Sequence, residues 1–172
     1  MRTDSLTIRE AREADVPQLA AVKPTEAMHR ERLATAAAGH IRYLVAMLDG
    51  QVVGFAVLAL EQPAGWPPVG PLTLLLDVLV LPSCRGGGIG TALVRAAEAI
   101  VVGMAGRQLF ISVDPRANAL ALKLYRRLGF VPVNGEPYES PWSYTDADGQ
   151  VHSGVEWCID LCKVLVTEPS DA

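Results

Sequence analysis

The sequence predicts a single α/β domain, and three observations support this prediction. Segments with strand and helix character alternate along the 172 residues of the chain. One nearly continuous apolar segment, 72–81, leads through a glycine-rich run into an apolar helical segment, 91–102. Half of the residues are hydrophobic, which is enough for one sizeable core. We therefore expect one domain over residues 1–172, with its core at about 5–166.

The N-terminal part is expected to hold a strand, two helices and a hairpin. Pro17 suits the first turn of a helix that starts at Asp15, and Gly39 ends an alanine-rich helical segment. The pair Asp49-Gly50 is a strong hairpin signal between two apolar runs. Segment 62–71 is rich in proline and glycine and is expected to be a loop. The expected elements are a strand at 6–9, helices from Asp15 and over 25–38, and strands at 41–48 and 52–60.

The C-terminal part is expected to complete the sheet. Segment 72–81 is predicted to be a central strand that is buried on both faces. The helix over 117–128 ends at Gly129, a residue typical of helix C-termini. Segment 134–154 is expected to be a polar connection. Four apolar residues are expected on one face of that helix: Leu120, Ala121, Leu124 and Leu128. The other elements are a helix over 91–102 and strands at 109–113, 130–133 and 155–166.

The run Arg85-Gly86-Gly87-Gly88-Ile89-Gly90 carries the clearest functional signal. A strand, a glycine turn and a helix in this order present free backbone N–H groups at a helix N-terminus, where an anion can bind. The dinucleotide-binding spacing fails, because Thr91 or Leu93 stands where a third glycine is needed. The P-loop pattern fails because no lysine lies between Lys23 and Lys123. A purely structural glycine turn is the remaining alternative.

Two ordered phrases give the run a family context. The first is "DVLVLPSCRGGGIGTALVRAAE", in which Arg85, Gly88 and Gly90 fill fixed positions of an acyl-CoA-binding signature. The second is "SVDPRANALALKLYRRLGF", in which Asn118 and Tyr125 match in order. Together they resemble the GNAT superfamily of N-acyltransferases. The likeness is strong over 72–131, moderate over 5–61 and weak beyond 134.

The resemblance implies a particular fold and cofactor site. The fold is a mixed, mostly antiparallel sheet of about six to seven strands, flanked by helices, with a splayed parallel strand pair that holds CoA. The pair would be formed by segments 72–81 and 109–113, with pantetheine along the backbone at Val78 and Val80. The cosubstrate is acetyl-CoA, and no metal is expected. The cofactor-binding residues implied are Val78, Val80, Arg85, Gly86, Gly87, Gly88, Ile89, Gly90, Thr91, Asn118 and Tyr125.

Asn118 and Tyr125 are seven residues apart, so both lie close to one face of a helix. By resemblance, the asparagine holds pantetheine and the tyrosine lies near the thioester sulfur. A tyrosine is protonated at neutral pH and can donate to a departing thiolate, so Tyr125 is the expected general acid. The alternative is that Asn118 only begins the helix and Tyr125 only packs at its edge.

Asp77 is the candidate general base, because a carboxylate within an apolar strand needs a partner or a function. Because side chains alternate along a strand, Asp77 is expected to point to the opposite face from Val78, although a bulge could change the direction in which it faces. Weaker candidates for holding a charged substrate are Glu136, Glu139, Asp146 and Glu156. The three histidines, His29, His40 and His152, are expected at the surface.

Charge and cysteine content exclude some classes of partner. Segment 134–172 has one basic residue, Lys163, against eight acidic ones, so it could attract a cationic amine or form a solvated hairpin. The sequence has no cluster of basic residues of the kind that binds nucleic acid. It also has no apolar stretch long enough to cross a membrane. A cytoplasmic location follows as the default expectation, and a homodimer is left open. The cysteines, Cys84, Cys158 and Cys162, are expected to be ordinary free thiols.

The function expected from these observations is direct transfer of an acetyl group from acetyl-CoA to a primary amine of a small molecule or peptide. A relay through Cys84 is less favoured, since its motif contains no histidine. Two alternatives stay open. One is a non-catalytic acyl-CoA sensor, and the other is an enzyme that uses a larger acyl-CoA or an alcohol acceptor.

Overall fold

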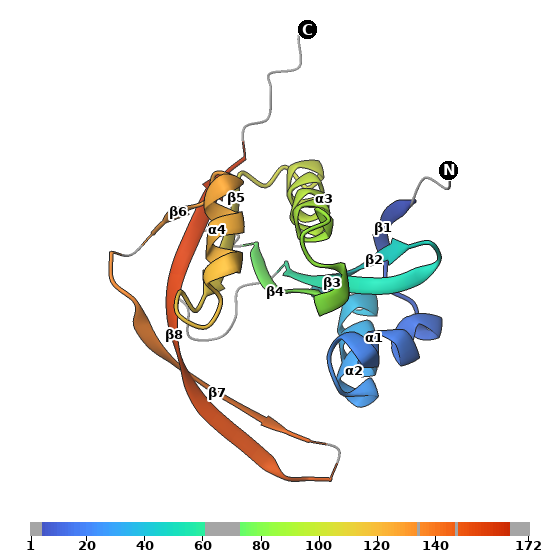
Figure 1. The fold of residues 1–172 in the computed structure, drawn as a ribbon. Helices are drawn as coiled ribbons and strands as arrows, with labels where there is room; N and C mark the ends of the chain where they lie inside the picture. Colours follow the sequence, from blue (N-terminus) through green and yellow to red (C-terminus); the bar gives the residue numbers. More distant parts are fainter. Residues whose placement is uncertain (1–4, 61–72, 134, 147, 166–172) are drawn as a thin grey trace, which may run out of the picture.

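The computed structural model of the chain describes residues 5–60, 73–133, 135–146 and 148–165 (Figure 1). The expected loop over 62–71 falls within a segment that lies outside these residues. The helices are α1 (Val16–Val22), α2 (Glu26–Ala37), α3 (Ile89–Gly103) and α4 (Ala119–Arg127), with short 3-10 turns at Glu13–Asp15 and Pro82–Cys84. The strands are β1 (Leu6–Glu10), β2 (Ile41–Leu48), β3 (Gln51–Ala59), β4 (Leu74–Val80), β5 (Gln108–Val113), β6 (Val131–Pro132), β7 (Tyr138–Thr145) and β8 (Val151–Val164).

The strands form one mixed sheet in the order β1-β2-β3-β4-β5-β8-β6, with β7 paired to β8. All of these pairs are antiparallel except β4 with β5, which is parallel. The α/β class that the sequence predicts, and the mixed, mostly antiparallel sheet that the family resemblance implies, are therefore confirmed. The parallel pair lies at the centre of the sheet, between the N-terminal hairpin and the C-terminal strands.

Strands β4 and β5 separate soon after they meet. They pair only at Leu74 with Phe110 and at Leu75 with Ile111. On the other edge of β4 the register with β3 shifts, so that Leu76 is an extra residue opposite no partner. The side chain of Leu76 is 49% exposed. The prediction that this strand is buried on both faces is thus wrong beyond Leu75, because the divergence from β5 opens its second half.

Helices cover both faces of the sheet (Figure 1). Helices α1 and α2 pack on one face, over a core that includes Leu19, Phe55 and Leu74. Helices α3 and α4 pack on the other, over a larger core that includes Leu75 and Leu93. Leu74 and Leu75 belong to different cores because successive side chains of a strand point to opposite faces of the sheet. As a result, the two faces of the sheet around the β4–β5 divergence are built from different elements.

Segment 134–154 is more regular than the sequence indicates. Strands β7 and β8 pair from Tyr138 with Cys158 to Thr145 with Val151, which makes a long hairpin that projects from the body (Figure 1). The expectation of an irregular polar connection is therefore wrong, whereas the alternative of a solvated hairpin matches β7 and β8. The segment lacks a clear alternation of apolar and polar residues, because the projecting hairpin has no core beneath it. Instead, Trp142 packs over Gly154, where an added Cβ would meet the indole at 2.6 Å.

His29 corrects a second expectation, because its side chain is fully buried rather than at the surface. Its Nδ1 lies 2.5 Å from the Tyr43 hydroxyl, and its Nε2 lies 2.6 Å from the Lys23 carbonyl oxygen. The carbonyl can only accept, so Nε2 donates to it and Nδ1 accepts from the hydroxyl. Phe55 packs edge-on against the ring. No sequence motif marks this histidine, since its partners come from different elements.

Burial makes the stability of the protein sensitive to acid at His29. Burial first, and then the charges of Arg32 and Lys23, hold the pKa of His29 below 6.5 in the folded state. The unfolded chain then binds more protons as the pH falls below about 6.5, so the folded state loses stability in that range. We expect His29→Gln to reduce the loss of unfolding free energy between about pH 8 and pH 5, measured by urea denaturation. His40→Gln, at an exposed site, should leave that loss unchanged; an equal effect of both would contradict this assignment.

Candidate active site

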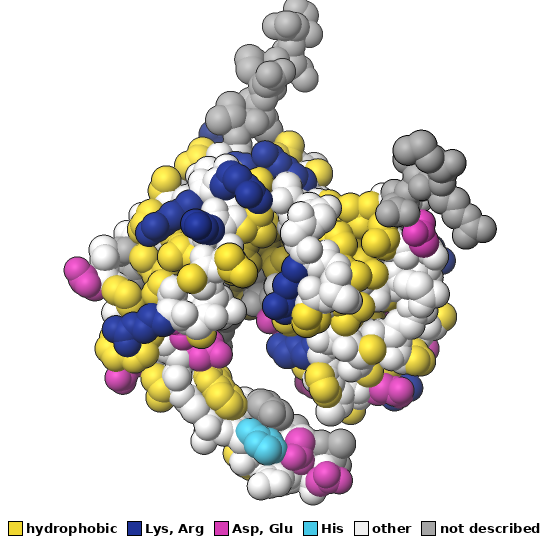
Figure 2. All heavy atoms as spheres, viewed as in Figure 1, with side chains coloured by type: hydrophobic (Ala, Val, Ile, Leu, Met, Phe, Trp, Pro, Cys, Tyr) yellow, Lys and Arg dark blue, Asp and Glu magenta, His cyan; other side chains and the backbone are white. Residues whose placement is uncertain are grey.

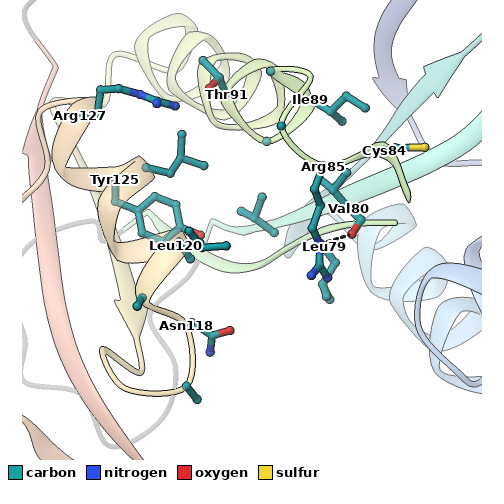
Figure 3. Close-up of a pocket in the computed structure, with 18 of the residues that line it drawn as sticks. Leu79, Val80, Cys84, Arg85, Ile89, Thr91, Asn118, Leu120, Tyr125 and Arg127 are labelled. Atoms are coloured by element: carbon teal, nitrogen blue, oxygen red, sulfur yellow. Dashed lines mark hydrogen bonds between the residues drawn. The ribbon is translucent and has the colours of Figure 1, made fainter. Parts of the chain in front are cut away.

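A cavity of about 600 Å³ opens where β4 and β5 diverge (Figure 3). Its walls come from the end of β4, the glycine run with the start of α3, and α4 with the loop before it. Of the residues that the sequence singles out for a cofactor, ten line this cavity: Val78, Val80, Arg85, Gly86, Gly88, Ile89, Gly90, Thr91, Asn118 and Tyr125. Gly87 and Asp77 are not among the lining residues.

The glycine run makes a bare helix N-terminus at one end of the cavity. Gly86 and Gly88 have φ angles of 81° and 82°, which residues with a Cβ rarely adopt. The first hydrogen bond of α3 runs from the Ala92 N–H to the Gly88 carbonyl, so the three preceding N–H groups of the helix have no partner within it. No side chain caps this terminus and no acidic residue occupies the first turn. These features suit an anionic ligand.

Two arginines lie at this part of the cavity and point in different directions. Arg85 Nε donates to the Val80 carbonyl at 3.1 Å, so its guanidinium folds back along β4 (Figure 3). Arg127 extends from α4 across the opening, toward the start of α3 (Figure 3). The Arg85 side chain therefore stabilises the turn, whereas Arg127 offers a positive charge beside the bare N-terminus.

The second half of β4 forms another wall. Beyond Leu75 this strand pairs with β3 but not with β5, so the edge of its backbone toward β5 faces the cavity. The side chains of Val78 and Val80 pack against the larger core. This leaves backbone N–H and C=O groups on the open edge, which an extended ligand arm can pair with as a strand would.

Asn118 and Tyr125 lie on the α4 wall. Asn118 is the N-cap residue of α4, but its side chain makes no capping bond. Instead, the carboxylate of Asp114 accepts from the N–H groups of Arg116 and Ala117 and shapes the preceding turn. The Asn118 side chain is exposed at the cavity. Leu120, which belongs to the expected apolar face of this helix, is 79% exposed and lines the cavity, so this side of the helix borders the opening.

Tyr125 projects from α4 into the cavity (Figure 3). Its ring is 4% exposed and packs against Phe130, with centroids 5.9 Å apart. Among the residues that the structure describes, its hydroxyl has no hydrogen-bond partner. Burial, with a smaller contribution from the charge of Asp77, raises the pKa of Tyr125 to about 12. The ring is thus held in place by packing, and its hydroxyl is protonated and free to donate to a ligand.

Asp77 lies on the other face of the sheet, toward α1 and α2. Its Oδ2 accepts from Lys23 Nζ at 3.1 Å and from Arg32 Nη2 at 2.5 Å. The structure therefore gives Asp77 two cationic partners that sequence reasoning missed. They lie 54 and 45 residues away, so no local pattern reveals them. The charge of Asp77 nevertheless contributes, after burial, to the raised pKa of Tyr125.

A second polar cluster lies beside the divergence. Ser112 is the first β5 residue beyond the last pair with β4, and it pairs with Asp160 of β8. The Asp160 carboxylate accepts from the Ser112 hydroxyl at 2.5 Å and from the Tyr138 hydroxyl at 2.8 Å. The C-terminal hairpin thus contributes polar groups beside the point where β4 and β5 separate, a role that the sequence does not indicate.

The remaining candidates do not converge on one site. Asp146 accepts from backbone N–H groups of the β7–β8 turn and pairs with His152 Nε2 at 2.7 Å. Glu136, Glu139 and Glu156 are exposed on the C-terminal hairpin and its approach. The three cysteines are free. Within the described ranges, no group of three His, Cys, Asp or Glu residues could hold a metal ion, and no helix is long and apolar enough to cross a membrane.

Comparison with known proteins identifies the class to which this fold and site belong. The model of the acetyltransferase (GNAT) family matches residues 8–130. The chain belongs to the GNAT acetyltransferase family, the family of acyl-CoA-dependent N-acyltransferases. This confirms the resemblance carried by the glycine run and the Asn118–Tyr125 phrase.

Individual relatives agree with this assignment. Phosphinothricin N-acetyltransferase of Alcaligenes faecalis is 29% identical over 140 residues, which cover 73% of this chain and 70% of the relative. An N-acetyltransferase from Staphylococcus aureus Mu50 has a similar structure, with a TM-score of 0.70, 18% identity, and coverage of 94% of this chain and 99% of that one. A phosphinothricin acetyltransferase from Sinorhizobium meliloti, solved in complex with acetyl-CoA, has a TM-score of 0.66 at 21% identity, covering 96% and 94% of the two chains. The two structures show likeness of fold.

Proposed function

We propose that the protein transfers an acetyl group from acetyl-CoA directly to a primary amine. The observation that carries the proposal is the cavity itself. It joins a bare helix N-terminus, an open strand edge and an unpartnered tyrosine hydroxyl within one continuous space. These are the three parts needed for a diphosphate, an extended pantetheine arm and a thioester. The acetyl-CoA complex of the Sinorhizobium meliloti relative supports this choice of cosubstrate.

In this proposal the diphosphate binds the backbone from Gly86 to Thr91, including Gly87 and Ile89, with Arg127 adding positive charge. The pantetheine arm pairs with backbone at Val78 and Val80, and the Asn118 amide binds it from the α4 side. Arg85 acts by holding the turn. The thioester then reaches the divergence of β4 and β5, beside the Tyr125 hydroxyl.

The chemistry follows from this placement. The amine nitrogen attacks the thioester carbonyl carbon, forming a C–N bond, and the C–S bond breaks as CoA leaves. Tyr125 donates its proton to the departing thiolate and thereby acts as general acid. The attacking amine must lose a proton, and Asp77 Oδ1 is the proposed acceptor, directly or through water. The N-acetylated amine and free CoA are the products.

The acceptor is proposed to enter from the face covered by α1 and α2, opposite the cofactor. A deep hollow lies between the side of the molecule that carries β7 and β8 and the side that carries α1 and α2 (Figures 1 and 2). Lys and Arg side chains line one wall of this hollow (Figure 2). The partly exposed carboxylate of Asp77 lies on this face. An amine that approaches here meets the thioester from the side that the cofactor leaves open.

A screen for acetyl-CoA consumption tests the proposal. Polyamines, aminoglycosides, amino acids and peptide N-termini each present a primary amine in a different electrostatic setting. Release of free CoA that depends on one of these acceptors is the expected result. Binding of acetyl-CoA without turnover on any amine would instead indicate a sensor. Faster turnover with a longer acyl-CoA would indicate that the longer acyl-CoA, and not acetyl-CoA, is the acyl donor.

Asp77→Asn tests the proposed base. The amide cannot accept the amine proton, so kcat should fall by about 10²-fold while the affinity for acetyl-CoA stays the same. Thermal unfolding should be measured beside the rates and CoA binding, because Lys23 and Arg32 lose their common partner in this variant and the stability of the fold must be checked. Glu136→Gln, an exposed change of the same kind, is the control. A kcat equal to that of the parent protein would remove Asp77 from the mechanism.

A further inference from the structure

Lys23, Asp77 and Arg32 form a compact cluster of charges on the acceptor side. Both cations bind the same oxygen, Oδ2, of the Asp77 carboxylate. In the part of the chain that the structure describes, Oδ1 has no hydrogen-bond partner. The cluster therefore carries one net positive charge and still offers one free acceptor atom. A ligand that matches it needs a negative group beside a positive one.

The cations also have donors that Asp77 does not use. Arg32 Nη1 is shielded from solvent and has no hydrogen-bond partner among the described residues. The Lys23 ammonium has three N–H donors and one carboxylate partner, and its side chain is 38% exposed. The Lys23 ammonium is therefore the donor group that a bound carboxylate can reach directly, whereas Arg32 Nη1 lies beneath the surface and Arg32 contributes mainly its charge.

The surrounding residues hold the cluster in place. The guanidinium of Arg32 lies over the rings of Tyr43 and Phe55, at 6.0 Å and 5.4 Å from their centroids. Buried His29 accepts from the Tyr43 hydroxyl and donates to the Lys23 carbonyl oxygen, which fixes the turn that carries Lys23. Both cations are thus positioned before any ligand arrives, so binding requires little ordering.

The cluster lies close to the proposed point of acetyl transfer. Asp77 belongs to β4, in the stretch where this strand has left β5. Its neighbour Val78 lines the cofactor cavity, while Asp77 faces α1 and α2. The effect of the Asp77 charge on the pKa of Tyr125 agrees with this closeness. An amine held at Oδ1 is therefore near the thioester.

From this geometry we infer that the acceptor is a free α-amino acid, recognised through both its charged groups. Its carboxylate binds Lys23 and Arg32, and its ammonium binds Asp77 Oδ1. The two groups share one carbon, so a single compact cluster can hold both. A simple amine or a polyamine has no group to offset repulsion by the two cations, and a peptide N-terminus has no adjacent carboxylate. This inference rests on the proposed function and narrows its substrate class.

The test compares each of the common amino acids with its carboxamide as acceptor for acetyl-CoA. Replacing the carboxylate by an amide removes one charge and leaves the amine and side chain in place. We expect at least one amino acid to exceed its amide in kcat/KM by about tenfold or more, the size typical of a charge-assisted hydrogen bond. Arg32→Gln should lower this ratio several-fold, mainly through KM, with Lys23 left as one cationic partner, and Arg32→Lys should restore part of it.

Arg30→Gln is the matched control, because Arg30 lies on the same helix and its partners, Glu13 and Glu26, are exposed. It should leave the ratio unchanged. Acetyl-CoA binding by the Arg32 variants confirms that they are folded. If amides or simple amines are equal or better throughout the panel, the inference is overturned while the proposed function stands. If neither set is acetylated but another amine of the wider screen is, the inference is likewise overturned and the proposed function stands. If no amine in either panel or in the wider screen is acetylated, the proposed function itself fails.

Discussion

Replacing Gly88 by glutamate is expected to weaken acetyl-CoA binding strongly. Gly88 is the N-cap residue of α3 and lines the cavity, with open space where a Cβ would lie. A carboxylate there would sit beside the proposed diphosphate site, where like charges a few ångströms apart repel by roughly 2–4 kcal/mol. Affinity should therefore fall by about 30-fold to 1000-fold, measured by calorimetric titration with acetyl-CoA.

Gly39→Glu is a close control for this change. Gly39 has a φ of 85°, nearly the same as the 82° of Gly88, and it too has nothing within 4 Å of an added Cβ. Both substitutions therefore impose the same kind of backbone strain, of about 1 kcal/mol. Gly39 lies after α2, away from the cavity. Equal loss of binding in both variants, or none in Gly88→Glu, would show that the glycine run does not hold the diphosphate.

Tyr125→Phe is expected to lower kcat by about 10²- to 10³-fold, the usual contribution of a positioned general acid. The phenyl ring keeps the packing against Phe130, so the fold and acetyl-CoA affinity should be retained. Only the hydroxyl that faces the cavity is lost. Steady-state rates with titration of acetyl-CoA separate the two effects. A variant that binds acetyl-CoA and turns over normally would show that another group protonates the thiolate.

The pH dependence of kcat provides a second test of the role of Tyr125, through the protonation state of its hydroxyl. Its raised pKa, about 12, means that the hydroxyl keeps its proton well above the ordinary tyrosine value of about 10. Loss of activity from ionisation of Tyr125 should therefore not occur below about pH 11. A fall in kcat near pH 10 that disappears in Tyr125→Phe would contradict a buried, protonated tyrosine.

Local sequence patterns predict the parts of the fold and site that depend on neighbouring residues. The glycine turn before α3 is visible because Gly86 and Gly88 adopt conformations that few other residues tolerate. The spacing of Asn118 and Tyr125 places both on α4, since seven residues make nearly two turns. The hairpin at Asp49-Gly50 follows from its turn chemistry.

The missed features depend on contacts between distant segments. His29 is buried because Tyr43 and the Lys23 backbone satisfy its ring nitrogens, and neither pairing leaves a pattern along the chain. The cations around Asp77 come from the α1–α2 region, which only tertiary packing brings to β4. The β7–β8 hairpin lacks the alternation of apolar and polar residues that indicates a half-buried strand. The exposure of Leu120 follows from the cavity that it lines.

Mass spectrometry of the acceptor after reaction with isotope-labelled acetyl-CoA tests the central claim most directly. The account predicts that the acetyl label appears as an amide on a primary amine, that free CoA forms in equal amount, and that Tyr125→Phe slows both together. Tight binding of acetyl-CoA with no labelled amide on any amine, from the parent protein as well as the variant, would contradict it.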